Sequence, residues 1–480
     1  MQTLPTRFET VLRAAREFGP LILKVDEDLS KFRKLARFCE AQDAGALCVL
    51  SGGSGKGKTT AVYASSVLLR EVFNPVLSVP TLMSLALREI PKWLAENLPP
   101  VKQDRVTPVL IDGRESTDDE QGLRDVMGAL NNLVRGRPDL IFVWPTTDQE
   151  WQNRLVQTAR RFGSASFCPE RGVFQISGPA KSQWVDAAGL VLDQLGASWD
   201  EFGINQSSAE QLTNDWDTLG DFLNAVNQVR VDQEDFSENV TGLPEVIFVV
   251  SSHSQVTGDV ARLRNPSTYK LRTDELIGSA RRQEVGKFWR ERGAAQKSNL
   301  AWVSSLLQAK LVSLTPSTVA HACGVHASEG SGLRAALSGI EFRGKRSNGV
   351  TAFNTTDLAR FLDGKPVPEV LNRNKGRTSQ ATLEAYDAIQ AISAKKHKEI
   401  NKAILTLAGQ DAGRFDPEGV RYEVSLGGDA IADAVVPAAE REFHFEFHHI
   451  SGEACSPNKI ATYIMKKLRV YATQYNLIER

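Results

Sequence analysis

Short apolar runs alternate with amphipathic helical patterns along the first half of the chain. The runs are ALCVL (46–50), PVLSV (75–79), TPVLID (107–112), DLIFVW (139–144) and GVFQIS (172–177). Between them, segments such as QEWQNRLVQTARRF repeat apolar residues at a spacing of three or four, which is the spacing of one helix face. Strands that alternate with helices predict a parallel, doubly wound sheet, so we expect an α/β fold.

The second half of the chain alternates less regularly. A helical pattern over residues 199–231 stops at the polar stretch DQEDFSENVTGLP, and EVIFVVSSHS (245–254) then predicts a strand followed by a basic helical region. TPSTVAHACGV and SGLRAALSGI predict two short helices around a turn, and FRGKRSNGVTAF predicts a β-wing. NRNKGRTSQ (372–380) has the composition of a linker, and the remainder predicts helix, strand, strand, strand, helix.

These patterns divide the chain into six predicted segments. They are an N-terminal helical segment (1–42), a sheet-containing core (43–180), a helical region (181–235), a basic α/β segment (240–312), a module of helices and a wing (313–366) and a terminal α/β domain (381–480).

A glycine-rich motif joins the first predicted strand to the next helix. Residues 52–59, GGSGKGKT, satisfy the pattern G-x-x-x-x-G-K-[ST]. Glycines let successive backbone N–H groups converge on phosphate oxygens, and the helix N-terminus adds its positive end. Lys58 supplies charge to the β- and γ-phosphates of a nucleotide, and the Thr59 hydroxyl can coordinate Mg²⁺. The alternative, a turn with a solvated lysine, fits the strand–loop–helix context less well. The expected ATP-binding residues are Gly52, Gly53, Ser54, Gly55, Lys56, Gly57, Lys58, Thr59 and Thr60.

A second acidic residue is expected at the end of a neighbouring strand, where it would reach the same Mg²⁺ ion. Asp112 closes TPVLID and fits this position, although it could also simply start the turn DGRES. The next residue, where many such ATPases carry a Glu that orients the attacking water, is Gly113. Glu115 is the nearest substitute, so we expect Thr59 and Asp112 as metal ligands and Glu115 in hydrolysis.

With these motifs in place, residues 43–231 resemble the AAA+ family of P-loop ATPases. The next strand ends in polar residues where the family places its sensor 1, here Thr146 or Thr147, and the resemblance implies Thr146 as a further ATP-binding residue. A helix ending in Arg160-Arg161-Phe162 follows, where the family carries an arginine finger into the neighbouring subunit, and a helical lid comes after it. An arginine acting in trans stabilises charge on the transferring phosphoryl group. The resemblance therefore implies a homo-oligomer, either a ring or a filament.

Alternatives to these assignments remain open. Arg160 and Arg161 could be a basic helix end favoured by the helix dipole, and Arg230 is only a remote candidate for a sensor 2 arginine. A GTPase would need N-K-x-D, but PTTDQ lacks the lysine, and a small-molecule kinase would not need the second half of the chain.

Charge divides the chain. Residues 241–480 carry 32 Lys+Arg against 25 Asp+Glu, whereas residues 1–240 carry 25 against 33. A basic second half and an acidic first half favour a polyanionic partner for the second half only.

Hydrophobic residues make up 41% and charged residues 24%, which is globular composition. Apolar runs are far too short to span a membrane, and five scattered cysteines indicate free thiols. We expect a cytoplasmic protein without membrane contact.

Strict alternation marks residues 442–448, EFHFEFH. It places three Phe on one face of a strand and Glu, His, Glu and His on the other. DAIADAVVP, just before it, supplies Asp429 and Asp433. A strand-borne Asp beside a Glu two residues from a basic group is how a nuclease holds a divalent metal near a nucleophilic water. Residues 385–480 thus resemble the PD-(D/E)XK nuclease superfamily, which implies Asp433 and Glu446 as Mg²⁺ ligands.

This terminal stretch departs from the nuclease pattern at one position. The lysine of the motif is replaced by His448, for which Lys459 is a possible spatial substitute, and Glu399 could serve as the acid on the preceding helix. The alternatives are a sheet edge with solvated Glu and His, an inactive nuclease fold that binds without cutting, and a zinc site. The zinc ligands would be His444, His448, His449 and Cys455.

Residues 314–362 resemble a winged helix-turn-helix module. SGLRAALSGI would be the recognition helix, with Arg343, Lys345 and Arg346 on the wing as contacts to DNA phosphates. A protein-binding winged helix or a plain helical hairpin is the alternative.

Together these features predict an AAA+ ATPase that acts on DNA. ATP and Mg²⁺ are the expected cofactors, and Lys58, Asp112, Glu115, Arg160, Arg161, Asp433, Glu446 and His448 are the expected catalytic residues. DNA cleavage by the terminal domain is a further expectation, and the pairing of domains suits a bacterial anti-phage or mobile-element system with partner proteins. The competing hypothesis is a nucleotide-dependent scaffold with little turnover, whose inactive nuclease-like domain recruits partners.

Overall fold

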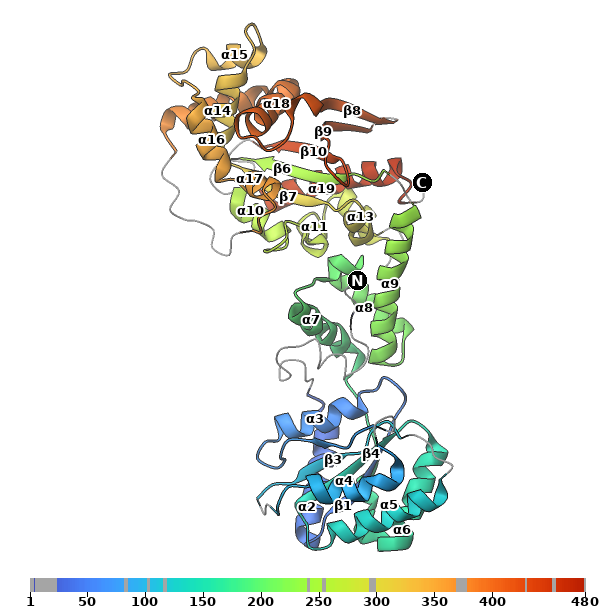
Figure 1. Ribbon diagram of the computed structural model, residues 1–480. Helices are drawn as coiled ribbons and strands as arrows, with labels where there is room; N and C mark the ends of the chain where they lie inside the picture. Colours follow the sequence, from blue (N-terminus) through green and yellow to red (C-terminus); the bar gives the residue numbers. More distant parts are fainter. Residues whose placement is uncertain are drawn as a thin grey trace. The chain divides into compact units, whose positions relative to one another are not determined.

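The computed structural model (Figure 1) describes residue 4 and residues 24–81, 85–101, 104–114, 119–239, 242–252, 256–292, 299–367, 378–427, 430–450 and 455–478. The chain divides into two compact units. The first is built from Met1–Ser198 and Glu210–Asn227, and the second from Trp199–Ala209 and Gln228–Arg480.

The first unit contains a five-stranded sheet in which neighbouring strands are all parallel, in the order β2-β3-β4-β1-β5. The strands are β1 (Ala46–Ser51), β2 (Leu77–Ser78), β3 (Thr107–Leu110), β4 (Leu140–Thr146) and β5 (Val173–Gln175). The parallel α/β fold predicted from the alternating pattern is confirmed.

Helices cover both faces of this sheet. They are α2 (Asp26–Gln42), α3 (Lys58–Leu68), α4 (Ile90–Asn97), α5 (Glu120–Val134) and α6 (Gln149–Phe167), with short 3₁₀ turns η2 (Leu87–Glu89) and η3 (Glu170–Gly172). Leu47 and Val49 of β1 are buried with residues of α4, α5 and α6, whereas Cys48 and Leu50 are buried with residues of α2 and α3. Alternate strand residues therefore anchor opposite helical layers, as a doubly wound sheet requires.

The region after β5 is helical, as expected. It contains α7 (Trp184–Leu195), α8 (Gln206–Leu212) and α9 (Leu219–Asn239), with 3₁₀ turns η4 (Lys181–Gln183), η5 (Trp199–Phe202) and η6 (Thr213–Asp215). The break predicted at DQEDFSENVTGLP is wrong, because α9 continues to Asn239. Its residues Val229 and Phe236 pack against the core of the second unit, and this burial sustains a helix through a polar sequence.

The second unit is built on a mixed five-stranded sheet in the order β7-β6-β10-β9-β8. Its strands are β6 (Glu245–Ser251), β7 (Lys310–Leu314), β8 (Arg421–Gly427), β9 (Ala430–Val436) and β10 (Phe443–His449). β10 runs parallel to β6, and β6 runs parallel to β7, whereas β9 is antiparallel to both β8 and β10. The basic segment and the terminal stretch, predicted as separate domains, thus share one sheet.

Helices also cover both faces of the second sheet. On one side lie α10 (Val256–Leu263), α11 (Thr273–Ser279), α12 (Glu284–Arg290), α13 (Leu300–Leu306) and α19 (Pro457–Gln474). On the other lie α14 (Pro316–His326), α15 (Gly332–Leu337), α16 (Arg346–Asn354), α17 (Asp357–Leu362), α18 (Gln380–Thr406) and the π-helical turn η7 (Leu407–Asp411), with the 3₁₀ turn η8 (Pro417–Gly419) before β8.

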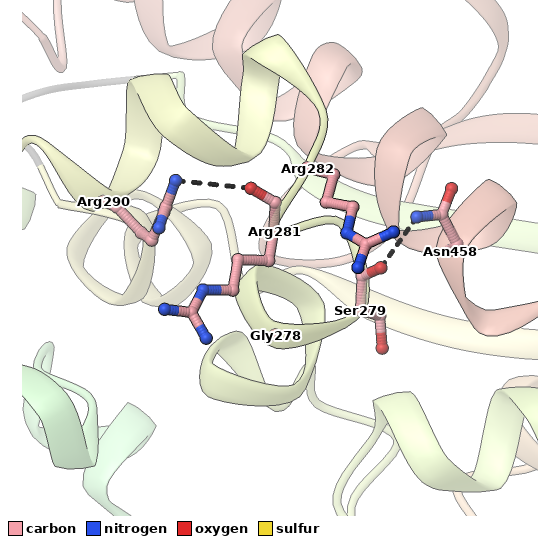
Figure 2. A pocket seen from close by; sticks show the side chains of 6 residues that line it. All are labelled: Gly278, Ser279, Arg281, Arg282, Arg290 and Asn458. Atoms are coloured by element: carbon pink, nitrogen blue, oxygen red, sulfur yellow. Dashed lines mark hydrogen bonds between the residues drawn. The ribbon is translucent and has the colours of Figure 1, made fainter.

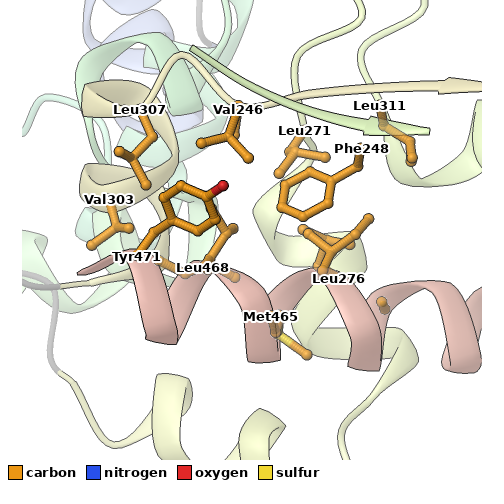
Figure 3. Close-up of a cluster of buried hydrophobic side chains, with 14 of the residues drawn as sticks. Val246, Phe248, Leu271, Leu276, Val303, Leu307, Leu311, Met465, Leu468 and Tyr471 are labelled. Atoms are coloured by element: carbon orange, nitrogen blue, oxygen red, sulfur yellow. The ribbon is translucent and has the colours of Figure 1, made fainter. Parts of the chain in front are cut away.

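The core under α19 holds the two parallel strands β6 and β7. Val246 and Phe248 of β6 and Leu311 of β7 are buried against Leu468 and Tyr471 of α19 (Figure 3). A fully buried side chain of this size contributes about 1.5–3 kcal/mol. This layer therefore packs residues near position 247 against residues near position 470, which lie far apart along the sequence.

The predicted β-wing is wrong. Residues 315–366, which are all described, contain helices α14–α17 and no strand. In place of the wing, α16 begins at Arg346 and packs the partly buried Val350 and the buried Phe353, three residues apart, against the core. That spacing is helical rather than extended. The two short helices predicted before it are present as α14 and α15.

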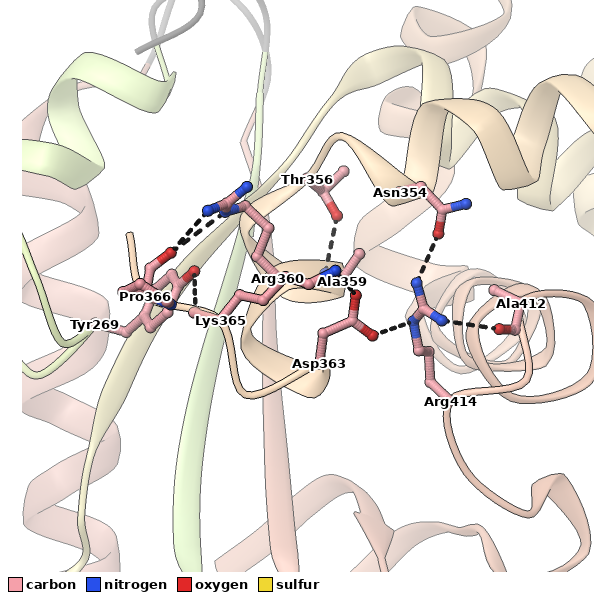
Figure 4. Close-up of polar contacts among 10 residues, drawn as sticks. All are labelled: Tyr269, Asn354, Thr356, Ala359, Arg360, Asp363, Lys365, Pro366, Ala412 and Arg414. Carbon is pink, nitrogen blue, oxygen red and sulfur yellow. Dashed lines mark hydrogen bonds and ion pairs between the residues drawn. The ribbon is translucent and has the colours of Figure 1, made fainter. Parts of the chain in front are cut away.

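Polar contacts hold α16 and α17 in place (Figure 4). Arg414, which follows η7, pairs with Asp363 at 2.9 Å and donates to Asn354 at 2.9 Å. Arg360 donates to the carbonyl oxygen of Pro366 at 3.3 and 3.1 Å. The α16–α17 pair is thereby tied to the turn that follows α18.

In the described part of the chain, no helix combines the length and the apolar character needed to cross a membrane. All five cysteines are free, as expected, and four of them are buried.

Arg264 and Asp357 form a buried ion pair at 3.0 Å in the second unit, with 1% and 8% of their side chains exposed. The hydroxyl of Ser313 donates to the same carboxylate at 2.6 Å. We expect Asp357→Ala to lower the free energy of unfolding by about 3–5 kcal/mol, because it leaves a buried guanidinium without its partner.

Urea unfolding of the whole chain measures this loss. Glu291→Ala removes one partner of the exposed Lys287–Glu291 pair and serves as the control; its expected cost is below about 1 kcal/mol. Equal midpoints for the two variants would show that the buried pair contributes little.

Candidate functional site

The glycine-rich loop of residues 52–57 lies between β1 and α3, as its sequence predicts. Ser51 ends the strand and Lys58 begins the helix. Gly55 and Gly57 have φ values of 77° and 84°, in the left-handed region that favours glycine. The first N–H groups of α3 have no partner within the helix and face the loop. The loop therefore presents backbone donors at the positive end of an eleven-residue helix.

The Lys58 side chain folds back onto the backbone of the glycine loop. Its ammonium donates to the carbonyl oxygens of Gly52 at 2.8 Å and Gly53 at 3.2 Å. Only 9% of the residue is exposed. The two hydrogen bonds hold the Lys58 side chain inside the loop.

Thr59 and Asp112 meet beside the loop. The Thr59 hydroxyl donates to Oδ2 of Asp112 at 2.6 Å, and the backbone N–H of Gly113 donates to Oδ1 at 2.8 Å. A hydroxyl and a carboxylate oxygen in contact are the ligand types that Mg²⁺ takes from proteins. The two predicted ligands are thus brought together, and they fit the predicted ion.

The strand that carries Asp112 is not the neighbour of β1. β4 pairs with both β1 and β3 and lies between them, so the expected adjacency is wrong. Asp112 still reaches Thr59 because parallel strands end at the same edge of the sheet. Glu115 lies outside the described residues.

Close backbone contacts support the loop from two directions. A Cβ on Gly55 would lie 2.7 Å from the Thr218 hydroxyl, and one on Gly178 would lie 2.7 Å from the carbonyl oxygen of Lys56. The buried carboxylate of Asp28 accepts the N–H groups of Ser177 and Gly178 at 2.9 and 3.0 Å. The motif itself does not reveal these supports, which come from α2, the turn after β5 and the start of α9.

The predicted sensor and finger residues lie in different settings: Thr146 is at the end of a buried strand and the two arginines are on an exposed helix face. Thr146 ends β4 opposite Ser51, is fully buried and donates to the carbonyl oxygen of Asp148 at 3.1 Å. Arg160 and Arg161 are exposed on α6, which continues to Phe167, so they do not end the helix as predicted. Thr147 also follows β4.

Arg230, the remote sensor 2 candidate, is committed elsewhere. It pairs with Glu234 at 3.2 Å and donates to the carbonyl oxygen of Glu201 at 3.1 Å. Its guanidinium also lies 5.0 Å from the centre of the Phe202 ring.

A second cluster of carboxylates lies in the middle of the second sheet. β9 and β10 pair with Phe445 opposite Ala434, so Asp433 and Glu446 come next in the same register. Asp433 accepts the N–H of Phe447 at 2.7 Å, and Glu446 is fully buried. The sheet edge with solvated Glu and His, left open by the sequence, is therefore contradicted.

Residues of α19 cover Glu446. The Lys467 ammonium lies 2.6 Å from Oε2, and the Tyr471 hydroxyl donates to Oε1 at 2.8 Å. Burial, and then the neighbouring Asp433, raise the pKa of Glu446 to about 7, and burial also raises the pKa of Asp433. Lys467 was missed by sequence reasoning. The spacing of Lys459, Tyr463, Lys467 and Tyr471 marks one face of α19, but it does not identify the strand residue that this face covers.

The histidine that replaces the motif lysine is not a cation at neutral pH. His448 stacks on Tyr463, with ring centres 4.2 Å apart and planes 3° from parallel. Burial, and then Lys459, lower the pKa of His448 to about 4. Lys459 therefore lies near His448, and Lys467 rather than Lys459 is the lysine bound to Glu446.

The remaining residues that the sequence offered as acid or metal ligands do not form a metal site with Asp433 and Glu446 in the described part of the chain. Glu399 pairs with Lys396 at 2.9 Å and accepts the N–H of Leu333 at 3.1 Å, so it serves the start of α15. The described residues contain no group of three His, Cys, Asp or Glu placed to hold a metal ion, and the four-residue zinc site is wrong. Asp429 lies outside the described residues.

No protein-family model matches the chain, and a search of curated proteins finds no match. The assignment of both sites therefore depends on the residues and their geometry.

The raised pKa of Glu446 predicts how stability depends on pH. Between the ordinary value of 4.5 and about 7, the folded chain retains a proton that the unfolded chain releases. This group therefore makes the chain less stable as the pH rises through that window. We expect Glu446→Gln to remove the loss, on the order of 1–3 kcal/mol.

Urea unfolding at pH 5 and pH 7.5 tests this expectation. Glu442→Gln, which neutralises a half-exposed carboxylate just before the same strand, is the matched control and should retain the wild-type pH dependence. Parallel pH profiles for wild type and Glu446→Gln would contradict the assignment.

Proposed function

We propose that the chain is a nucleotide-binding P-loop ATPase of the AAA+ type, which couples ATP binding and hydrolysis to DNA engagement by its second unit. The observation that carries this proposal is the 2.6 Å contact between Thr59 and Asp112 beside the glycine loop closed by Lys58. Thr59 and Asp112 would hold Mg²⁺, which would neutralise charge on the β- and γ-phosphates.

The strand order supports the AAA+ assignment. β4 lies between β1, which precedes the glycine loop, and β3, which precedes Asp112. Thr146, the last residue of β4, therefore lies between the ends of these two strands. Arg160 and Arg161 are exposed on α6. Exposed arginines of this kind suit a role in trans, at the nucleotide of a neighbouring subunit in a homo-oligomer.

The charge of the second half supports a DNA role. Residues 241–480 carry a net charge of +7 by count of Lys, Arg, Asp and Glu. Neutralising phosphates with Lys and Arg supplies most of the affinity of sequence-independent DNA binding. We place DNA engagement on residues 241–480, which are the basic part of the second unit, for this reason.

Steady-state ATP hydrolysis tests the first part of the proposal. We expect Lys58→Ala to lower kcat/KM for ATP by at least about 100-fold, because the loop loses the cation that stabilises the transferring phosphoryl group. Lys34→Ala removes an exposed lysine of the same unit and should leave turnover unchanged. Adding duplex DNA should stimulate the wild-type rate.

Two outcomes would count against this function. Turnover that survives in Lys58→Ala would exclude the loop as the catalytic site. Tight ATP binding without turnover, and indifferent to DNA, would instead support a nucleotide-dependent scaffold, in which Gly113 replaces the acid that hydrolysis needs.

A second candidate function is metal-dependent DNA cleavage by the second unit. The specific observation in its favour is the trio of Asp433, Glu446 and Lys467, in which a lysine from α19 reaches the acidic pair of β9 and β10. These are the residue types that a nuclease of the PD-(D/E)XK kind combines. The burial of Glu446 under α19 means that access to this trio requires movement of its cover.

Cleavage of supercoiled plasmid in the presence of Mg²⁺ or Mn²⁺ tests the second candidate. We expect the wild-type chain to nick the plasmid and Asp433→Asn to lose this activity, because the variant removes one of two carboxylates available for the metal. Glu418→Gln changes an exposed carboxylate in the turn before β8 and should cut normally. Equal cutting by Asp433→Asn, or none by the wild-type chain, would reduce the trio to a structural role.

A further inference from the structure

A pocket in the second unit has arginine side chains along its walls. Its volume is about 550 Å³, and it is lined by Gly278, Ser279, Arg281, Arg282, Arg290 and Asn458. These residues come from the end of α11, the turn that follows it, the end of α12 and the start of α19 (Figure 2). Ligand pockets typically measure about 300–1,000 Å³, so a nucleotide-sized molecule fits this volume.

The three arginines have no acidic partner in the described part of the chain. All three are exposed, and no carboxylate lines the pocket. Arg262 and Arg272, on neighbouring elements, both pair with Glu275 instead. Three guanidinium groups around one pocket repel each other unless an anion lies between them.

The local backbone holds these side chains around the pocket. A Cβ on Gly286 would lie 2.2 Å from the carbonyl oxygen of Ala280, so this close approach between the start of α12 and the turn after α11 requires glycine. Arg290 donates to the carbonyl oxygen of Arg281 at 3.3 Å, and Asn458 donates to that of Ser279 at 2.8 Å (Figure 2). These contacts join α12 and the start of α19 to the end of α11 and the turn that follows it.

The start of α19 adds to the positive potential. Asn458 lies in the first turn of this eighteen-residue helix, whose N-terminus carries a partial positive charge. Figure 2 shows Arg282 extending toward Asn458 at this end of the pocket. Guanidinium groups beside a helix N-terminus are suited to phosphate oxygens, which they bind with paired N–H donors.

We propose that this pocket binds a phosphate-bearing anion. The phosphate belongs either to the backbone of a nucleic acid or to a free phosphorylated molecule, and both present the same oxygens to the three guanidinium groups. The site is separate from the phosphate loop, and it does not require that the loop hydrolyse ATP.

Calorimetric titration of the full chain tests this site. Lys58→Ala is used as the background, so that the phosphate loop contributes little to the measured binding. The probes are inorganic pyrophosphate and a short DNA duplex of random sequence. The test variant is Arg281→Ala/Arg282→Ala, and the matched control is Lys395→Ala/Lys402→Ala, which removes two exposed charges from α18 on the opposite face of the sheet.

We expect the arginine variant to weaken binding of at least one probe by about tenfold or more, and the lysine control to weaken it by no more than threefold. Weakened pyrophosphate binding identifies a free phosphorylated ligand. Weakened duplex binding with no measurable pyrophosphate binding identifies the nucleic-acid backbone. Arg281→Lys/Arg282→Lys keeps the charge but loses the planar donors, so its affinity should lie between those of the Lys58→Ala parent and the alanine variant.

Equal losses in the arginine and lysine variants would overturn the proposal, because they would reflect net charge alone. Unchanged binding of both probes in the arginine variant would overturn it as well. Since every variant carries Lys58→Ala, these outcomes are independent of whether the chain hydrolyses ATP.

Discussion

The second unit depends on the parallel pairing of β6 with β10. Ser251 and His449 end the two strands and share a hydrogen bond of 2.8 Å, although they lie 198 residues apart along the chain. This pairing places β10 between β6 and β9 at the centre of the sheet, and thereby makes one core of the basic segment and the terminal stretch. It also explains the burial of Glu446, because a central strand is covered by helices on both faces.

The sequence predicted correctly those features that depend only on residues close together in the chain. The glycine loop, its strand and its helix follow from residues within one turn of each other, and the three Phe of β10 lie on one face as their alternation requires. The partner of that strand was beyond this kind of reasoning, since nothing near residue 445 specifies residue 247. The same limit explains why the β-wing prediction failed. Val350 and Phe353 pack on a core formed by distant residues, and the local sequence does not show that core.

α19 covers Glu446 of β10, and the contacts between the two elements follow a match in spacing that neither sequence segment shows alone. Two strand residues advance about 6.6–6.8 Å, and four helical residues advance about 6.0 Å. His448 and Glu446, two apart on β10, therefore match Tyr463 and Lys467, four apart on α19. The stacked ring and the ion pair are successive steps of this match, and the identity of the lysine could be read only once the two elements had been placed together.

The separation of β6 from β10 has a consequence for synthesis on the ribosome. The first sheet is complete once β5 has emerged, whereas β6 must wait for almost the whole of the second unit to be made before its partner appears. During that interval the apolar strand VIFVV has no partner on its β10 side, a condition that favours aggregation. The second sheet can therefore be completed only after the first, and any factor that shields this strand until β10 is made would lower the risk of aggregation.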